Sequence, residues 1–169
     1  MRRIIYISGG QRSGKSDFAQ RMAEELSDNP TYLATAKCWD AEFEKRIERH
    51  KALRGEHWCN IEQEHYISRL DLEERVVLMD CVTLWLTNIF SDCSYDLEAS
   101  LAEAKREWNL FAQKDFTVIV VSNEIGMGVI PMERSSRGFV DLQGWMNQYI
   151  AASADDVYTM ISGIPLKLK

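Results

Sequence analysis

An eight-residue stretch near the amino terminus places the strictest limit on the fold. It consists of Gly9, Gly10, Gln11, Arg12, Ser13, Gly14, Lys15 and Ser16. The apolar, β-branched run Arg3–Ser8 precedes it, and apolar residues at helical spacing follow over Ser16–Leu26. A strand, a glycine-rich turn and a helix in this order are the context in which G-x-x-x-x-G-K-[ST] binds phosphate. The alternative, an ordinary glycine-rich turn, would require the match at all four specified positions of this eight-residue pattern, and its strand–helix context, to be accidental.

The chemistry of this loop depends on its backbone amides and on two side chains. Glycines let the chain bend so that successive N–H groups point inward at phosphate oxygens. The helix that follows adds the positive end of its dipole. Lys15 is then placed to bridge the β- and γ-phosphates, and the Ser16 hydroxyl to ligate Mg²⁺. The sequence therefore predicts a site for a nucleoside triphosphate.

A second strand supplies the carboxylate with which such a loop normally works. Val76–Met79 is apolar and is followed by Asp80, which can hold the metal directly or through water. The alternative is that Asp80 caps the helix expected to begin at Val82, a common role for aspartate. We assign Asp80 to the nucleotide site, with Ser16 as the other expected metal ligand.

Strand and helix patterns alternate along the rest of the chain. Further strands are expected at Thr31–Thr35, Thr117–Val121 and Val157–Ile161, with a short edge piece at Pro165–Lys169. Further helices are expected at Asp40–Arg54, Val82–Phe90, Leu97–Phe111 and Gly138–Ala152, with a loop at Ser122–Ser136. Apolar strands separated by helices predict an α/β fold, a mostly parallel sheet covered on both faces. With 169 residues and no linker, we expect a single nucleotide-binding domain over residues 1–169.

Composition limits the partners. The chain has 20 Lys and Arg against 26 Asp and Glu, a net charge of −6, so no basic face for nucleic acid is expected. No apolar run approaches the roughly 20 residues of a transmembrane segment, and the apolar run at the amino terminus is too short for a signal peptide. The cysteines of the chain show neither a CxxC pair nor zinc spacing. We expect reduced thiols in a cytoplasmic protein.

The helix expected before residue 55 carries a basic stripe. Arg46, His50 and Arg54 fall at i, i+4 and i+8 and so share one face. Two guanidiniums beside an imidazole suit phosphate binding around a nucleophile. Taken alone, the residues favour the other interpretation, in which His50 is a satisfied histidine at the edge of the apolar face. His57 and His65 have no such surroundings, and we expect them at the surface.

The residues alone leave two classes of nucleotide protein open. Signalling GTPases read guanine with an N/T-K-x-D element after a strand, and the sequence has none. Thr117–Val121 leads instead into Ser122, Asn123 and Glu124. This favours a small-molecule kinase over a nucleotide-dependent switch or binding module without acceptor chemistry.

Together these motifs resemble the bifunctional adenosylcobinamide kinase / adenosylcobinamide-phosphate guanylyltransferase family of cobalamin biosynthesis. The matching stretches extend nearly from end to end, and two of them, Asn-Glu-x-Gly-x-Gly-x-x-Pro and Arg-Ile-x-x-His, are much more specific than the phosphate loop. Besides that loop, they are Tyr32–Ala36, Arg46-Ile47 with His50, Arg54 and Trp58, Asp80–Asn88, Ser122–Pro131, Arg137, Phe139, Asp141, Gly144, Asn147-Gln148, Ala154-Asp155 and Ser162-Gly163. Val140 stands where the family often has arginine.

The resemblance implies two reactions in a RecA-like P-loop fold. ATP or GTP phosphorylates the hydroxyl of adenosylcobinamide; GTP then guanylylates a histidine, which passes GMP to adenosylcobinamide phosphate. The family's histidine falls on His50, and Lys15 is the second catalytic residue. Besides the phosphate loop, the implied nucleotide site comprises Ala34, Thr35, Ala36, Lys51, Ala52, Leu53, Arg54, Glu62 and Asp80. Family members assemble into trimers, so a homo-oligomer is expected. A kinase without guanylyl transfer is the alternative.

Overall fold

A twisted sheet organises the computed structural model, which describes residues 2–37, 55–73 and 75–169. Its strand order within these ranges is β3-β2-β4-β5-β1-β6-β7. The strands are β1 (Arg3–Gly9), β2 (Thr31–Ala34), β3 (Cys59–Glu62), β4 (Val76–Asp80), β5 (Thr117–Val121), β6 (Asp156–Ile161) and β7 (Ile164–Lys167). Every neighbouring pair is parallel except β6 and β7, which form an antiparallel hairpin. The carboxyl ends of the parallel strands therefore meet at one edge.

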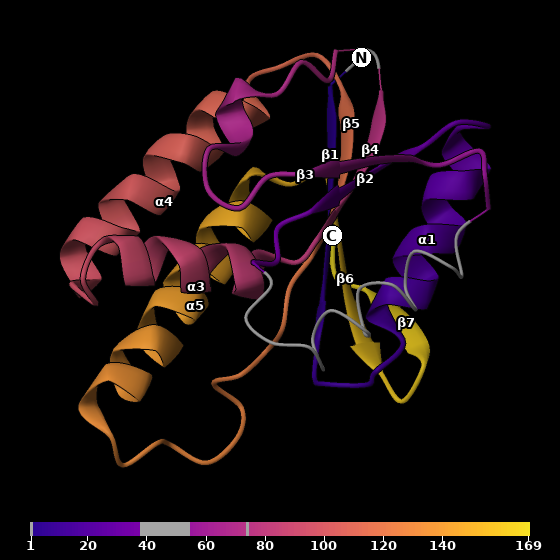
Figure 1. Ribbon diagram of the computed structural model, residues 1–169. Coiled ribbons are helices and arrows are strands. Elements are labelled where there is room, and N and C mark those ends of the chain that lie inside the picture. The colour runs from indigo at the N-terminus through magenta and orange to yellow at the C-terminus, as the bar shows by residue number, and fades with distance from the viewer. Residues whose placement is uncertain (1, 38–54, 74) are drawn as a thin grey trace.

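Helices cover both faces of this sheet. They are α1 (Lys15–Leu26), α3 (Val82–Asp92), α4 (Leu97–Ala112) and α5 (Arg134–Ser153), with a short 3₁₀ turn η1 at Ile67–Arg69. Figure 1 shows α1 on one face, and α3, α4 and α5 together on the other. In the described residues, no helix is long and apolar enough to cross a membrane.

The alternation of side chains along β1 explains how both faces are filled. Ile4 and Tyr6 pack into the larger apolar core, beneath α3, α4 and α5. Ile5 and Ile7 pack into the smaller core, with Ala19 of α1. Because successive side chains of a strand point to opposite faces, one apolar run serves two cores. This is the buried parallel strand that the sequence predicts.

The strands expected from the sequence are all confirmed, with ends that agree to within two residues. The helix expected at Asp40–Arg54 lies outside the described residues. The start of the helix predicted at Gly138 is wrong, because α5 begins at Arg134. The Glu133 carboxylate accepts from the N–H groups of Ser135 and Ser136 and so caps the first turn. We expected neither β3 nor η1.

Candidate nucleotide-binding site

The glycine-rich turn between β1 and α1 is held where only glycine fits. Gly9 has a φ of 152°, and a Cβ there would lie 2.7 Å from the carbonyl oxygen of Met160. Gly14 has a φ of 89°, and its Cβ would lie 3.2 Å from the Cα of Gly163. Gly163 also donates its N–H to the Ser13 carbonyl over 3.0 Å. The β6–β7 turn thus supports the loop from behind, and a side chain at either glycine would displace it.

Lys15 begins α1 and is 7% exposed. Its ammonium group donates to the carbonyl of Gly10, and it lies 3.4 Å from the Ser13 hydroxyl. Burial lowers the pKa of Lys15, an effect that the nearby Cys81 and Asp80 oppose. A desolvated cation held by neutral oxygens gains much from an incoming phosphate. The role predicted for Lys15, bridging the β- and γ-phosphates, stays a prediction.

Asp80 ends β4 beside the loop. Its Oδ2 accepts from the Ser16 hydroxyl and from the Tyr32 hydroxyl, each over 3.2 Å. The capping alternative is not seen, since Cys81 is the N-cap of α3 and that cap has no side-chain hydrogen bond. A hydroxyl beside a carboxylate offers oxygen ligands of the kind that Mg²⁺ prefers. The described residues hold no cluster of three or more His, Cys, Asp and Glu, but Mg²⁺ bound to phosphates needs only one or two protein ligands.

The segment after β2 reaches the same edge. Ala34 pairs with Asp80 on one side and with Glu62 on the other. Thr35 is fully buried, and its hydroxyl donates to the carbonyl of Cys81 over 2.8 Å. The amide of Asn88 donates to the Thr35 carbonyl over 2.7 Å. The fold thus brings Ala34–Ala36, the exposed Glu62, the phosphate loop and Asp80 to one end of the sheet, which we call the nucleotide edge. His50, Lys51, Ala52, Leu53 and Arg54 lie outside the described residues.

The chain after β5 is tied to the phosphate loop. The N–H of Ser122 donates to the carbonyl of Ile7 over 2.9 Å, and that of Glu124 to the carbonyl of Gly9 over 3.1 Å. The amide of Asn147 donates to the carbonyl of Asn123 and to the Glu124 carboxylate, each over 3.1 Å. Burial raises the pKa of Glu124, and the hydrogen bond from Asn147 opposes this. Sequence reasoning singled out this segment but gave Glu124 no role.

An apolar pocket of about 500 Å³ begins at the next residue, Ile125. It lies between α3, the loop after β5 and the first turns of α5. Its walls are mostly aliphatic and aromatic, with five hydroxyls among them. They are formed by Thr87, Phe90, Ser91, Tyr95, Ile125, Val129, Pro131, Ser135, Ser136, Phe139 and Val140. Such a lining suits an apolar molecule of drug size or larger.

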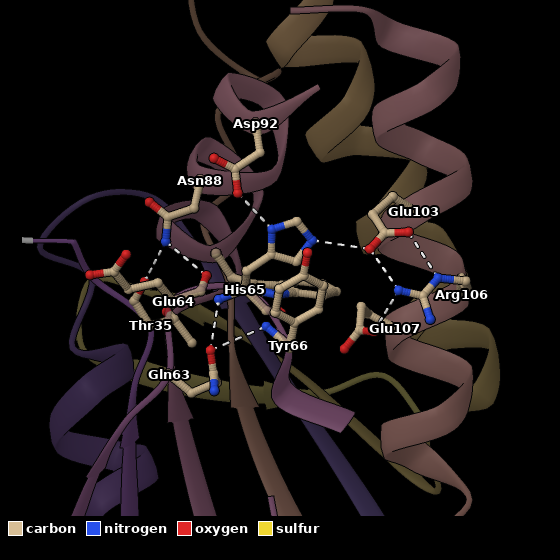
Figure 2. Close-up of polar contacts among 11 residues, drawn as sticks. Thr35, Gln63, Glu64, His65, Tyr66, Asn88, Asp92, Glu103, Arg106 and Glu107 are labelled. Carbon is tan, nitrogen blue, oxygen red and sulfur yellow. Dashed lines mark hydrogen bonds and ion pairs between the residues drawn. The ribbon is translucent and has the colours of Figure 1, made fainter. Parts of the chain in front are cut away.

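A second cluster of charges surrounds His65, which lies between the carboxylates of two helices (Figure 2). Its Nδ1 lies 2.6 Å from Asp92 of α3, and its Nε2 lies 3.1 Å from Glu103 of α4. Arg106 donates to Glu103 and to the buried Glu107. The prediction that His65 is a surface histidine is therefore wrong, since its side chain is only 12% exposed. Its partners come from distant helices, and the sequence gives no signal of this.

His57, the other histidine expected at the surface, has a side chain that is 46% exposed, which confirms that expectation. The neighbouring Trp58 is buried and donates its indole N–H to Glu24 over 3.0 Å. A hollow of about 500 Å³ is lined by residues of the His65 cluster and by residues of the nucleotide edge. Ala36, Glu62, Gln63, Glu64, His65, Tyr66 and Asp92 line it.

Comparison with known proteins covers nearly the whole chain. The profile of the family described as cobinamide kinase / cobinamide phosphate guanyltransferase matches residues 5–168. The bifunctional adenosylcobalamin biosynthesis protein CobP of Pseudomonas aeruginosa is 38% identical, over 96% of this chain and 95% of that protein. The bifunctional adenosylcobalamin biosynthesis protein CobU of Escherichia coli is 34% identical, over 98% of this chain and 99% of that protein.

Among solved structures, an ATPase from the type III secretion system of pathogenic bacteria shares the fold. The TM-score is 0.62 at 10% identity, over 94% of this chain and 52% of that chain. At such low identity the likeness concerns the fold alone. Together with the strand order and the phosphate loop after β1, it confirms the RecA-like P-loop architecture expected from the sequence.

Proposed function

Because this chain belongs to the cobinamide kinase / cobinamide phosphate guanyltransferase family, we propose that it carries out both reactions. It phosphorylates adenosylcobinamide with a nucleoside triphosphate and then transfers GMP from GTP to the product. Relatives that are 34–38% identical over nearly their whole length are named bifunctional adenosylcobalamin biosynthesis proteins. The main support is this full-length match. In addition, Ser16 of the phosphate loop donates a hydrogen bond to Asp80, so the loop and this carboxylate lie together.

The kinase half uses the groups described above. The amides of the phosphate loop and the buried Lys15 hold the β- and γ-phosphates and stabilise the charge that spreads over the γ-phosphoryl oxygens in transfer. Ser16 and Asp80 would hold Mg²⁺, which supplies Lewis-acid polarisation of those oxygens when bound. The acceptor hydroxyl attacks the γ-phosphorus, and the nucleoside diphosphate leaves.

The guanylyl half rests on His50, the residue on which the family's histidine falls. A neutral imidazole nitrogen attacks the α-phosphorus of GTP, pyrophosphate leaves, and a phosphoramidate bond forms. The phosphate of adenosylcobinamide phosphate then attacks the same phosphorus and releases the imidazole. We place Lys51, Ala52, Leu53, Arg54 and Glu62 in the nucleotide site that serves this step.

Labelling with GTP carrying ³²P at the α-position tests the proposal. The wild type should acquire an acid-labile, base-stable label, and His50→Ala should acquire none. His57→Ala is the matched control, because it removes an exposed histidine from the neighbouring part of the chain. Its labelling should equal that of the wild type. A His50→Ala protein that still carries label would overturn the assignment of the nucleophile.

The same samples separate the alternatives. A wild type that phosphorylates adenosylcobinamide but never acquires GMP would be a P-loop kinase without guanylyl transfer. A wild type that hydrolyses GTP slowly and modifies no corrinoid would be a nucleotide-dependent binding module. Kinase activity that survives His50→Ala would support separate roles for the two halves of the site.

We further place the enzyme in the cytoplasm as a homo-oligomer, a trimer by its resemblance to the family. Free thiols at Cys59, Cys81 and Cys93 support a reducing compartment. The loop before α5 exposes four large apolar side chains, which supports association with another copy. They are Met127, Val129, Ile130 and Met132. Light scattering on the purified protein tests the trimer, and a monomer across micromolar concentrations would contradict it.

A further inference from the structure

One carboxylate at the nucleotide edge has no part in the roles assigned so far. Glu124 lies three residues beyond Val121, the last residue of β5. Val121 pairs with Ile7 of the phosphate-loop strand on one side and with Asp80 on the other. The chain that carries Glu124 therefore leaves the sheet between the phosphate loop and the expected metal ligand.

Hydrogen bonds fix both ends of this residue. Its N–H donates to the carbonyl of Gly9 over 3.1 Å, and its Oε1 accepts from the amide of Asn147 over 3.1 Å. Asn147 is itself held, since its Oδ1 accepts from the Ser122 hydroxyl and the Gln143 amide. The side chains of Asn147, Ser122 and Gln143 are buried, whereas Glu124 is half-buried. Among the described residues, no Lys, Arg or His forms an ion pair with the Glu124 carboxylate.

We propose that Glu124 is the catalytic base of the kinase half-reaction, an inference that rests on the proposed function. As the acceptor oxygen bonds to the γ-phosphorus, its O–H bond breaks and the proton passes to the Glu124 carboxylate. The bond between the γ-phosphorus and the bridging oxygen breaks, and the nucleoside diphosphate leaves with that electron pair. No further co-reactant is needed, and the proton is returned to water after product release.

Three features of the structure favour Glu124 for this task over the other carboxylate at the edge. Asp80 already accepts from Ser16 and Tyr32 through one oxygen and is expected to face the metal. Burial raises the pKa of Glu124, which makes it a stronger base than an exposed glutamate. Ile125, the residue that follows Glu124 in the chain, lines the apolar pocket, so an acceptor bound in that pocket would lie close to Glu124.

Steady-state phosphorylation of adenosylcobinamide tests the proposal. Glu124→Gln keeps an oxygen that can accept from Asn147 but cannot take up a proton. We expect its kcat to fall by about 10²–10⁴-fold, the range of general-base catalysis, while KM for the acceptor changes by less than about threefold. Glu124→Asp should recover part of kcat. Glu25→Gln, on the exposed side of α1, is the matched control and should behave as the wild type.

Nucleotide affinity and thermal unfolding of each variant separate chemistry from folding. The proposal holds if Glu124→Gln binds a fluorescent GTP analogue and melts as the wild type does while kcat falls. It is overturned if kcat of Glu124→Gln stays within about threefold of the wild type, or if the loss follows nucleotide affinity instead. A wild type that never phosphorylates the corrinoid would refute the proposed function itself. Failure of the Glu124 proposal is distinct from this, because it is judged on variants of an active wild type.

Discussion

The nucleotide edge of the sheet and the cluster around His65 both carry charged side chains. The two regions differ in whether those side chains contact other charged or titratable groups or only neutral ones. Around His65, the charged groups contact one another or the imidazole: Asp92 and Glu103 flank the ring, and Arg106 bridges Glu103 and Glu107. At the nucleotide edge, Lys15 donates to neutral oxygens and Glu124 accepts from an amide. Charges that are satisfied internally hold helices together, whereas charges held by neutral groups remain available to a ligand.

The largest effect is expected where an uncompensated charge is removed. Lys15→Ala should lower kcat/KM of phosphorylation by about 10³-fold, because a preorganised cation facing the transferred phosphoryl group is lost. Its free energy of unfolding should change by less than about 1 kcal/mol, since this burial is itself unfavourable to the ammonium. Kinetics and urea unfolding on the same samples check both. A Lys15→Ala protein that is inactive because it is unfolded would break the comparison.

The pH dependence of phosphorylation gives the next effect. Glu124 must be deprotonated to act as a base, and burial holds its pKa above the ordinary value of 4.5. Activity should therefore fall about tenfold per pH unit below that raised pKa, and Glu124→Gln should lack this acid limb. Tyr6 faces Glu124 from β1, and burial raises the pKa of Tyr6 too, so it stays neutral throughout. An acid limb unchanged in Glu124→Gln would assign it to another group.

In the His65 cluster, the expected effect is on stability alone. Hydrogen bonds from Arg106 and His65 lower the pKa of Glu103 to about 2, from an ordinary value of 4.5. Its contribution is present above pH 4.5 and is lost as the pH falls towards 2. Glu103→Gln should cost about 1 kcal/mol at neutral pH and flatten the decline of stability in that window. Unfolding curves from pH 2 to 7 measure this. A matching loss of GTP affinity would contradict the separation of the two clusters.

The smallest effect concerns a thiol beside the nucleotide edge. Burial and the neighbouring Asp80 raise the pKa of Cys81 to about 12, so the reactive thiolate is scarce at pH 8. Cys59 is exposed on the edge strand β3. Iodoacetamide should therefore modify Cys59 at least about tenfold faster than Cys81, as mass spectrometry of the digested protein can show. Equal rates would mean that the nucleotide edge opens readily.

Local patterns predicted most of this molecule. The phosphate loop and the strand that ends at Asp80 are read from contiguous residues, because glycine geometry and apolar runs act over short distances. The strand β3 was missed because it lies at the edge of the sheet, where Ile61 is its only large apolar residue. The start of α5 was misplaced because a glutamate, an uncommon N-cap, begins it.

Contacts distant in sequence explain the remaining failures. His65 meets partners 27 and 38 residues away, and no periodicity records such a pairing. Glu124 stood inside a recognised motif, but its position between the phosphate loop and Asp80 follows only from the strand order. Motifs thus locate the chemistry, whereas the topology decides which carboxylate faces which atom.

The position of β1 has a consequence for synthesis of the protein. The first strand pairs with β5 and β6, whose residues begin at 117 and 156, and the turn at Gly163 supports the phosphate loop. On the ribosome, the phosphate loop is therefore made early but lacks β6 and the Gly163 turn until translation is nearly complete. Until β6 is made, one hydrogen-bonding edge of β1 is unpaired and open to other chains, which makes early release or pausing a point of aggregation risk.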